Sequence, residues 1–161
     1  MAMMSSYRTA VILAVTLVSC ARVPVAEREV AAPASSGSGS LVIEIGGLRN
    51  ATGRLNVSLF DGPEGFPQDT LMVVRSESVQ LMRDQALVVR FADVKYGEYA
   101  VAVLHDENSN SEMDTGFLGM PTEGFGFSNN PGLGFGAPSF ETCKFRFDGP
   151  EVILQIRIWY F

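Results

Sequence analysis

Apolar and polar residues alternate with a period of two through most of the chain after residue 40. The clearest example is the segment 54–59, in which Leu55, Val57 and Leu59 alternate with polar residues. Alternation of this kind places the apolar side chains on one face of a β-strand and the polar ones on the other. The same pattern predicts further strands at 41–45, 87–91, 99–103, 145–147 and 152–158, with weaker candidates at 71–74 and 79–82.

Turns rich in Gly, Pro, Asn and Asp separate these segments, and no segment shows a helical period. Several short strands in such an arrangement are typical of an antiparallel β-sandwich. The strand at 99–103 is apolar on both faces, as a central strand would be. The chain after residue 40 is long enough for one hydrophobic core. We therefore predict an all-β fold, an immunoglobulin-like or prealbumin-like sandwich of about seven strands with one long ordered loop.

The long loop is predicted at 106–138, before the strand at 145–147. Its many phenylalanines favour burial over disorder, and loops of this length in compact domains are usually functional or disordered. We expect an ordered loop over one end of the sandwich, which either packs on itself or forms a binding surface. The candidate binding residues are His105, Phe117, Phe125, Phe127, Asn129, Asn130 and Phe135.

Side chains with hard oxygen ligands begin this loop at a spacing like that of calcium loops. They are Asp106, Asn108, Asn110 and Asp114, with the backbone carbonyl of Glu112 and the carboxylate of Glu123 as further candidates. Ser111 stands where such a loop prefers glycine, and Phe117 stands where it places a bidentate carboxylate. The spacing therefore predicts a weak Ca²⁺ site, with a dissociation constant of roughly 10⁻⁴–10⁻³ M. The alternative is an Asx-rich turn whose side chains bond its own backbone.

His105 is the only histidine in the chain and continues the core-facing row of the strand at 99–103. This position favours a hydrogen-bonded structural histidine. A hydrolase with His105 as its base and Ser128 or Ser139 as its nucleophile is the least favoured interpretation, because the Gly-x-Ser-x-Gly motif is absent. We therefore predict that the protein is not an enzyme.

The first twenty residues have the anatomy of a secretory signal. Arg8 precedes an apolar stretch, 10–19, which is too short to span a bilayer. The stretch ends in Leu17-Val18-Ser19-Cys20, which resembles the lipobox of bacterial lipoproteins. That resemblance implies cleavage before Cys20 and acylation of Cys20, which would anchor the chain stably in a membrane. Ala21 in place of aspartate implies the outer membrane of a Gram-negative cell.

Three segments follow from these patterns: a lipoprotein signal peptide at 1–19, a lipidated cysteine with a flexible tether at 20–40, and a sandwich domain at 41–161. Loss of residues 1–19 removes one base, Arg8, and no acid, so the net charge changes from −6 to −7. An acidic chain argues against nucleic acid as a partner. The expected partners are the membrane, through the lipid, and an unidentified envelope protein or small ligand. We expect a monomeric domain on the periplasmic side of the outer membrane.

The segment 105–140 also carries a long motif that resembles the signature of a bacterial family, domain-of-unknown-function family 2141. It reads His105-Asp106-Glu107-Asn108-x-Asn110, then Met113-Asp114-Thr115-x-Phe117-Leu118-Gly119-x-Pro121-x-Glu123-Gly124-Phe125-Gly126-Phe127-Ser128-Asn129-Asn130, then Phe135-Gly136-x-Pro138-x-Phe140. Gly53-x-Leu55-x-Val57-x-Leu59-Phe60 and Gly65-Phe66-Pro67 are similar to the first half of that family. The family usually has Asn-Gly where this chain has Asn110-Ser111.

The resemblance implies a small secreted β-sandwich with no assigned activity. With the signal and the tether, it predicts a lipid-anchored envelope protein whose domain is a non-enzymatic binding or structural accessory module. An apolar ligand or a protein partner bound through the Phe/Gly-rich loop is the alternative.

Overall fold

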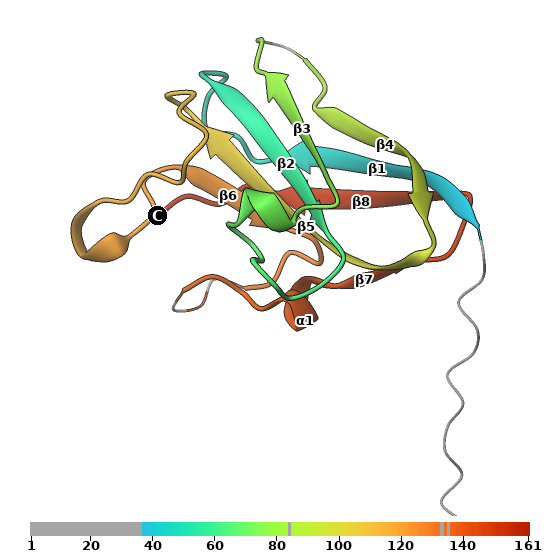
Figure 1. The fold of residues 1–161 in the computed structure, drawn as a ribbon. Helices are drawn as coiled ribbons and strands as arrows, with labels where there is room; N and C mark the ends of the chain where they lie inside the picture. The colour runs from blue at the N-terminus through green and yellow to red at the C-terminus, as the bar shows by residue number, and fades with distance from the viewer. Residues whose placement is uncertain (1–36, 84, 133, 135) are drawn as a thin grey trace, which may run out of the picture. The chain divides into compact units, whose positions relative to one another are not determined.

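The computed structural model describes residues 37–161 except 84, 133 and 135. The described chain forms two β-sheets (Figure 1). The first has the order β4-β1-β8, with β1 at Ser38–Gly46, β4 at Val88–Lys95 and β8 at Glu151–Arg157. The second has the order β3-β2-β5-β6, and β7 also pairs with β5. Its strands are β2 (Arg54–Phe60), β3 (Arg75–Gln80), β5 (Gly97–Asp106), β6 (Gly124–Phe127) and β7 (Phe145–Phe147).

Helical turns in the described residues are short, which confirms the all-β prediction. They are η1 (Thr70–Met72), η2 (Phe117–Gly119) and α1 (Phe140–Cys143). All strand pairs are antiparallel except β1 with β8, which run parallel. Among the residues described, no helix is both long and apolar enough to cross a membrane.

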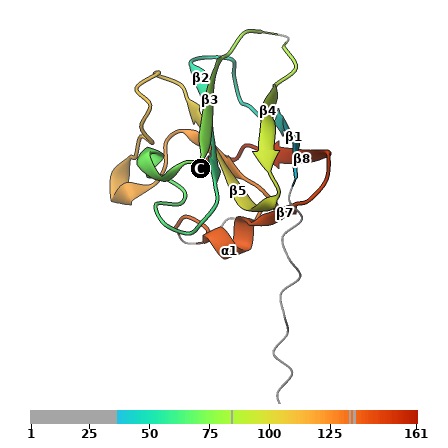
Figure 2. The same cartoon turned by 45° about the vertical axis from the view of Figure 1, so that its right-hand side comes forward.

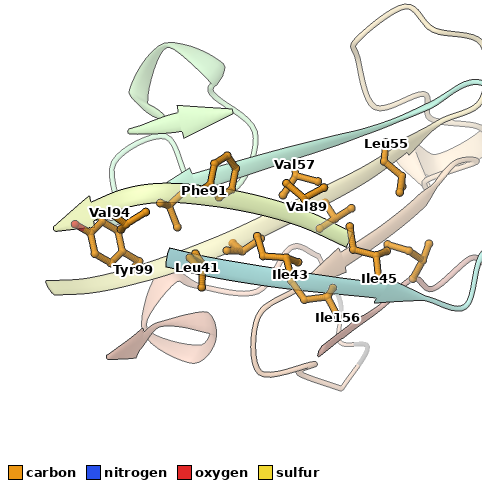
Figure 3. Close-up of a cluster of buried hydrophobic side chains, with 14 of the residues drawn as sticks. Leu41, Ile43, Ile45, Leu55, Val57, Val89, Phe91, Val94, Tyr99 and Ile156 are labelled. Carbon is orange, nitrogen blue, oxygen red and sulfur yellow. The ribbon is translucent and has the colours of Figure 1, made fainter. Parts of the chain in front are cut away.

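The main core lies between the two sheets and follows the predicted alternation (Figure 3). Leu41 and Ile43 of β1 and Leu55 and Val57 of β2 are fully buried, and they belong to one hydrophobic cluster with Ile156 of β8. Full burial of a side chain of this size contributes about 1.5–3 kcal/mol. The residues that alternate with these core residues point to the opposite face of each sheet.

A second, smaller core covers the opposite face of β5, which explains why that strand is apolar on both sides. Phe60, Ala100, Ala102, Phe140 and Cys143 are buried together there. The free thiol of Cys143 is a packed apolar group, and burial raises its pKa to about 11. The prediction that the strand at 99–103 is a central strand is therefore confirmed.

β3 lies mostly between the two weak strand candidates and overlaps only the first two residues of the candidate 79–82. The candidate 71–74 overlaps η1, whose first turn is capped by Asp69 through a 2.9 Å bond from the Leu71 N–H to its carboxylate. β3 itself is an edge strand without a buried residue, so no alternation marks it in the sequence. A hydrogen bond of 3.4 Å from Arg75 to the Asp93 carbonyl links it to β4 of the other sheet (Figure 2).

The predicted tether, 20–40, overlaps β1 by three residues, because β1 begins at Ser38. Gly39 looks like linker sequence, but a Cβ there would lie 2.6 Å from the Gly149 and Pro150 carbonyl oxygens. This close backbone contact accounts for a glycine within the strand. The signal peptide, Cys20 and the tether up to residue 36 lie outside the described residues.

The prediction of a single long loop at 106–138 is wrong, because β6 divides this segment. β6 pairs with Ala102–His105 and β7 pairs with Gly97–Tyr99, so the two strands follow one another along β5. Two separate loops result, 107–123 and 128–139. The Gly-Phe-Gly-Phe sequence of β6 lacks the polar and apolar alternation of the other strands, which is why the pattern missed it.

The glycines of β6 make room for the chain after β8. Phe125 and Trp159 exchange two backbone hydrogen bonds of 3.0 and 2.8 Å, so this segment crosses from the first sheet to β6. A Cβ at Gly124 would lie 2.4 Å from the Tyr160 ring, and one at Gly126 would lie 2.8 Å from the Arg157 carbonyl oxygen. Only glycine fits at these two positions.

We expect Gly124→Ala to lower the free energy of unfolding by about 1–3 kcal/mol, because the new methyl group displaces Tyr160. Gly46→Ala is the matched control, since Gly46 lies at the end of a strand and a Cβ added there would meet nothing within 4 Å. It should leave stability unchanged or raise it slightly. Urea unfolding of both variants measures this difference. Equal free energies of unfolding for Gly124→Ala and Gly46→Ala would contradict the close contact at β6.

Candidate functional site

The loop 107–123 leaves β5 after Asp106 and returns to β6 at Gly124. It extends from the end of the sandwich that lies away from the start of β1 (Figure 1). The residues predicted to bind a metal gather at its base, whereas its far end carries apolar side chains. These two parts have different chemistry.

Asp106 fixes the first turn of the loop from a fully buried position. Its Oδ1 accepts a hydrogen bond of 3.1 Å from the Asn110 N–H, and its Oδ2 accepts one of 2.8 Å from the Ser111 N–H. The Asn56 side chain donates a third bond, of 3.2 Å, to Oδ2. A buried carboxylate requires such partners, and here the loop backbone supplies two of them.

Asn108, Asn110 and Asp114 continue the same network. The Asn108 side-chain oxygen accepts from the Asn110 N–H at 3.0 Å, and the Asn110 side-chain oxygen accepts from the Glu112 N–H at 2.8 Å. Both side-chain amides donate to the Asp114 carboxylate, at 2.6 and 3.1 Å. Ser111 has φ 65°, the left-handed conformation that favours glycine. The turn forms with serine in place of glycine.

Glu123 joins the two ends of the loop. This residue is 4% exposed, and its carboxylate accepts the Glu107 N–H at 2.9 Å and the Asp114 N–H at 3.2 Å. The Arg49 guanidinium forms an ion pair with Glu107. The hydrogen bond from Arg49 lowers the pKa of the Glu107 carboxyl below its usual value. The base of the loop is thereby closed on itself.

The oxygen ligands predicted for Ca²⁺ are therefore close together but are used within the loop. The Glu112 side chain is exposed, and Glu123 bonds two backbone N–H groups. Within the described residues, no three His, Cys, Asp or Glu side chains are grouped to hold a metal ion. A cation would have to recruit amide oxygens from Asn108 and Asn110, which now serve the backbone. Calcium binding stays a prediction.

His105 has both ring nitrogens in hydrogen bonds and is fully buried. Its Nε2 lies 2.8 Å from the Thr52 carbonyl oxygen, and its Nδ1 lies 2.6 Å from the Tyr160 hydroxyl. A carbonyl oxygen can only accept, so Nε2 carries a proton and donates. The ring joins three distant segments of the chain. This arrangement supports a structural role and offers no exposed nitrogen to a substrate.

Asn129 and Asn130 also bond the backbone. The Asn129 amide donates to the Lys144 carbonyl at 2.8 Å. Asn130 bonds the edge of β8 twice, because its amide donates to the Gln155 carbonyl at 2.7 Å and its side-chain oxygen accepts the Arg157 N–H at 2.8 Å. A single side chain thus connects the two sheets. These contacts favour an architectural role for both asparagines over ligand binding.

Ser128, one of the two candidate nucleophiles of the least favoured interpretation, has an architectural position that sequence reasoning missed. It is fully buried at the junction of β6 and β7. Its hydroxyl accepts the Val101 N–H at 2.9 Å and donates to the Cys143 carbonyl at 2.6 Å. The hydroxyl therefore bridges the chain where backbone pairing is interrupted. In the sequence, this role is indicated only by the place of Ser128 between Phe127 and the two asparagines that follow it.

The candidate phenylalanines separate into two groups. Phe125 and Phe127 are half-buried on the second sheet, with ring centroids 5.8 Å apart. Phe117, in contrast, is 87% exposed, beside Leu118, which is 84% exposed. Phe135 lies outside the described residues.

We call the far end of the loop, residues 115–121, the apolar tip. A β-bridge between Thr115 and Pro121 closes it, and the Gly116 N–H donates to the Met120 carbonyl at 2.7 Å. η2 occupies the turn, and Leu118 within it has φ 60° and ψ 22°. The tip is an ordered turn that presents its large apolar side chains to solvent.

If the loop binds Ca²⁺, thermal unfolding should shift upward in its presence. At about 10 mM Ca²⁺, a site of roughly 10⁻³ M affinity stabilises the fold by about 1.4 kcal/mol, which raises Tm by about 4 °C. Asp114→Asn should remove the shift, and Mg²⁺ at the same concentration is the control ion. An unchanged Tm of the parent chain in Ca²⁺ would show that the loop is a self-bonded turn only.

Comparison with known sequences and structures concerns most of the sandwich domain and not the loop alone. The family model described as an uncharacterized protein conserved in bacteria (DUF2141) matches residues 43–155. No curated protein and no solved structure matches the chain. The matched segment runs from β1 into β8 and includes the loop 107–123, its tip and the two asparagines after β6. The chain is therefore a member of the uncharacterised bacterial family DUF2141.

Proposed function

We propose that the chain is a lipid-anchored protein of the bacterial cell envelope whose sandwich domain is a non-enzymatic binding module, and that its partner contacts the apolar tip. The observation that carries this proposal is the exposure of Phe117 and Leu118, at 87% and 84%. An isolated exposed apolar residue is ordinary on a protein surface. Two large apolar neighbours exposed together on a projecting, closed turn favour an interaction site.

The backbone of Leu118 strengthens the argument. A leucine in the left-handed region is strained by about 1–2 kcal/mol relative to an ordinary conformation. With 84% of its surface exposed, the side chain recovers little of this through packing inside the domain. Such strain persists where the surrounding structure imposes it and is frequent at binding sites. We infer that the leucine serves a contact outside the domain.

The hydrogen bonds at the base of the loop support a rigid presentation of the tip. Asp106 and Glu123 accept four loop N–H groups between them, from residues 107, 110, 111 and 114. A partner that binds a preorganised turn does not have to order it. The tip also projects from the domain (Figure 1), whereas small apolar ligands are usually held in concave sites. A macromolecular partner is therefore favoured over a small ligand.

The anchor part of the proposal rests on the Leu-Val-Ser-Cys motif ending at Cys20 and on the Ser/Gly-rich sequence before β1. β1 begins at one end of the sandwich, and the loop 107–123 extends from the other (Figure 1). A tether joined to β1 would leave the tip free to meet a partner. The enzymatic alternative has no comparable support, because His105 is buried and hydrogen-bonded at both nitrogens.

Leu118→Gly should abolish partner capture while keeping the domain at least as stable, because glycine relieves the strained backbone as it removes the contact. We expect the free energy of unfolding to stay equal or rise by up to about 1 kcal/mol. Capture is measured with a photo-cross-linking amino acid at Phe117 in living cells, where defined adducts should form in the parent chain and disappear in the variant.

Leu71→Gly is the matched control for this variant, because Leu71 is 88% exposed in η1 and has an ordinary φ. It should lose about 0.5–1 kcal/mol of stability and retain the adducts. Adducts that persist in Leu118→Gly would overturn the role of the tip, whatever the stabilities.

Cys20→Ser should abolish lipid attachment and release the protein from the membrane, because serine lacks the sulfur that the lipobox enzymes acylate. Incorporation of labelled palmitate, followed by fractionation of the cells, measures both effects. Cys143→Ser is the control, since Cys143 is buried in the second core. Equal palmitate labelling of Cys20→Ser and the parent chain would rule out the anchor.

A further inference from the structure

The apolar tip stands on an acidic loop. The segment 106–123 contains five acidic residues and no lysine or arginine. Asp106 and Glu123 are buried, and Glu107 is paired with Arg49. The remaining acidic groups are Glu112, which is exposed, and Asp114, which is half-buried, and both lie on the part of the loop that leads into the tip.

These two acids are not neutralised by cations of the described residues. The Asp114 carboxylate accepts hydrogen bonds from the side-chain amides of Asn108 and Asn110, which are neutral donors. Glu112 is exposed, and no ion pair in the described part of the chain includes it. Both acids lie within five residues of Phe117 along the chain, so a partner that covers Phe117 and Leu118 approaches this negative charge.

We propose that the partner is a protein with an apolar pocket for Phe117 and Leu118 whose rim carries lysine or arginine. This inference rests on the proposed function and adds the chemistry of the partner. Complementary charge at the edge of an interface steers association and selects the partner, while buried aromatic and aliphatic side chains at its centre dominate affinity.

The same charge argues against a lipid surface as the occupant of the tip. Segments that dock on membranes combine apolar residues with lysine and arginine, which attract anionic headgroups. The loop has the opposite sign, and the whole chain has a net charge of −6. Bilayer contact by the tip would therefore be weakened by repulsion, whereas a basic protein surface would be attracted.

The test uses the full chain, purified in detergent and immobilised, and a phage-displayed library of random peptides. We expect the selected peptides to combine aromatic or aliphatic residues with lysine or arginine. Their affinity should fall at least ~10-fold for Leu118→Ser, as for a central contact. It should fall about 3- to 10-fold for Glu112→Lys and become less sensitive to salt.

Glu77→Lys is the matched control for charge. Glu77 is exposed on β3, and the substitution changes the net charge of the chain as Glu112→Lys does. It should leave the affinity of the selected peptides unchanged. This result would show that the peptides respond to the charge near the tip and not to the net negative charge of the whole chain.

The outcomes distinguish this inference from the proposed function. Binding that is insensitive to Leu118→Ser would overturn both. Binding that depends on Leu118 but is unaffected by Glu112→Lys, or is weakened equally by Glu77→Lys, would overturn the basic rim alone. A photo-cross-linker at Phe117 that labels phospholipid instead of protein would also overturn the inference of a protein partner.

Discussion

The loop 107–123 depends on the hydrogen bonds that one buried carboxylate requires. Asp106 is fully buried at the end of the central strand, and a polar group there is costly unless hydrogen bonds replace its contacts with water. The N–H groups of Asn110 and Ser111 supply those bonds only if the chain turns back immediately after the strand. That turn brings Asp114 to Glu123, and Glu123 holds the two ends of the loop together. The position of the apolar tip follows from this chain of contacts.

Much of the long motif at 105–140 meets architectural demands. Gly124 and Gly126 let the end of the last strand lie on β6, and Ser128 fills an interruption in the backbone pairing. Asn130 connects β6 to β8. These residues build the fold, and none of them indicates a reaction. The candidate for function is instead a short segment, Phe117 and Leu118, whose exposure nothing in the fold requires.

Alternation in the sequence predicted the strands that bury one face in the core. β2 and β8 lie where the period of two placed them, and β5, which is buried on both faces, lies where its apolar run placed it. β3 has no buried residue and so no pattern, and β6 was hidden by glycines whose close neighbours come from the end of the chain. The calcium-like spacing located a real turn, because Asx residues form it whether or not an ion is bound. The conformation of Leu118 could not be predicted from the sequence, since leucine rarely adopts it.

The parallel pairing of β1 and β8 has a consequence for the order of assembly. β1 is the middle strand of its sheet, and its partners are β4 and the last strand of the domain. A chain synthesised from its N-terminus would therefore hold one edge of β1 open until residues 151–157 arrive. Contacts between such distant segments make folding slow relative to local pairing. The first sheet is complete only when β8 joins β1, so its closure depends on a segment far along the chain from β1.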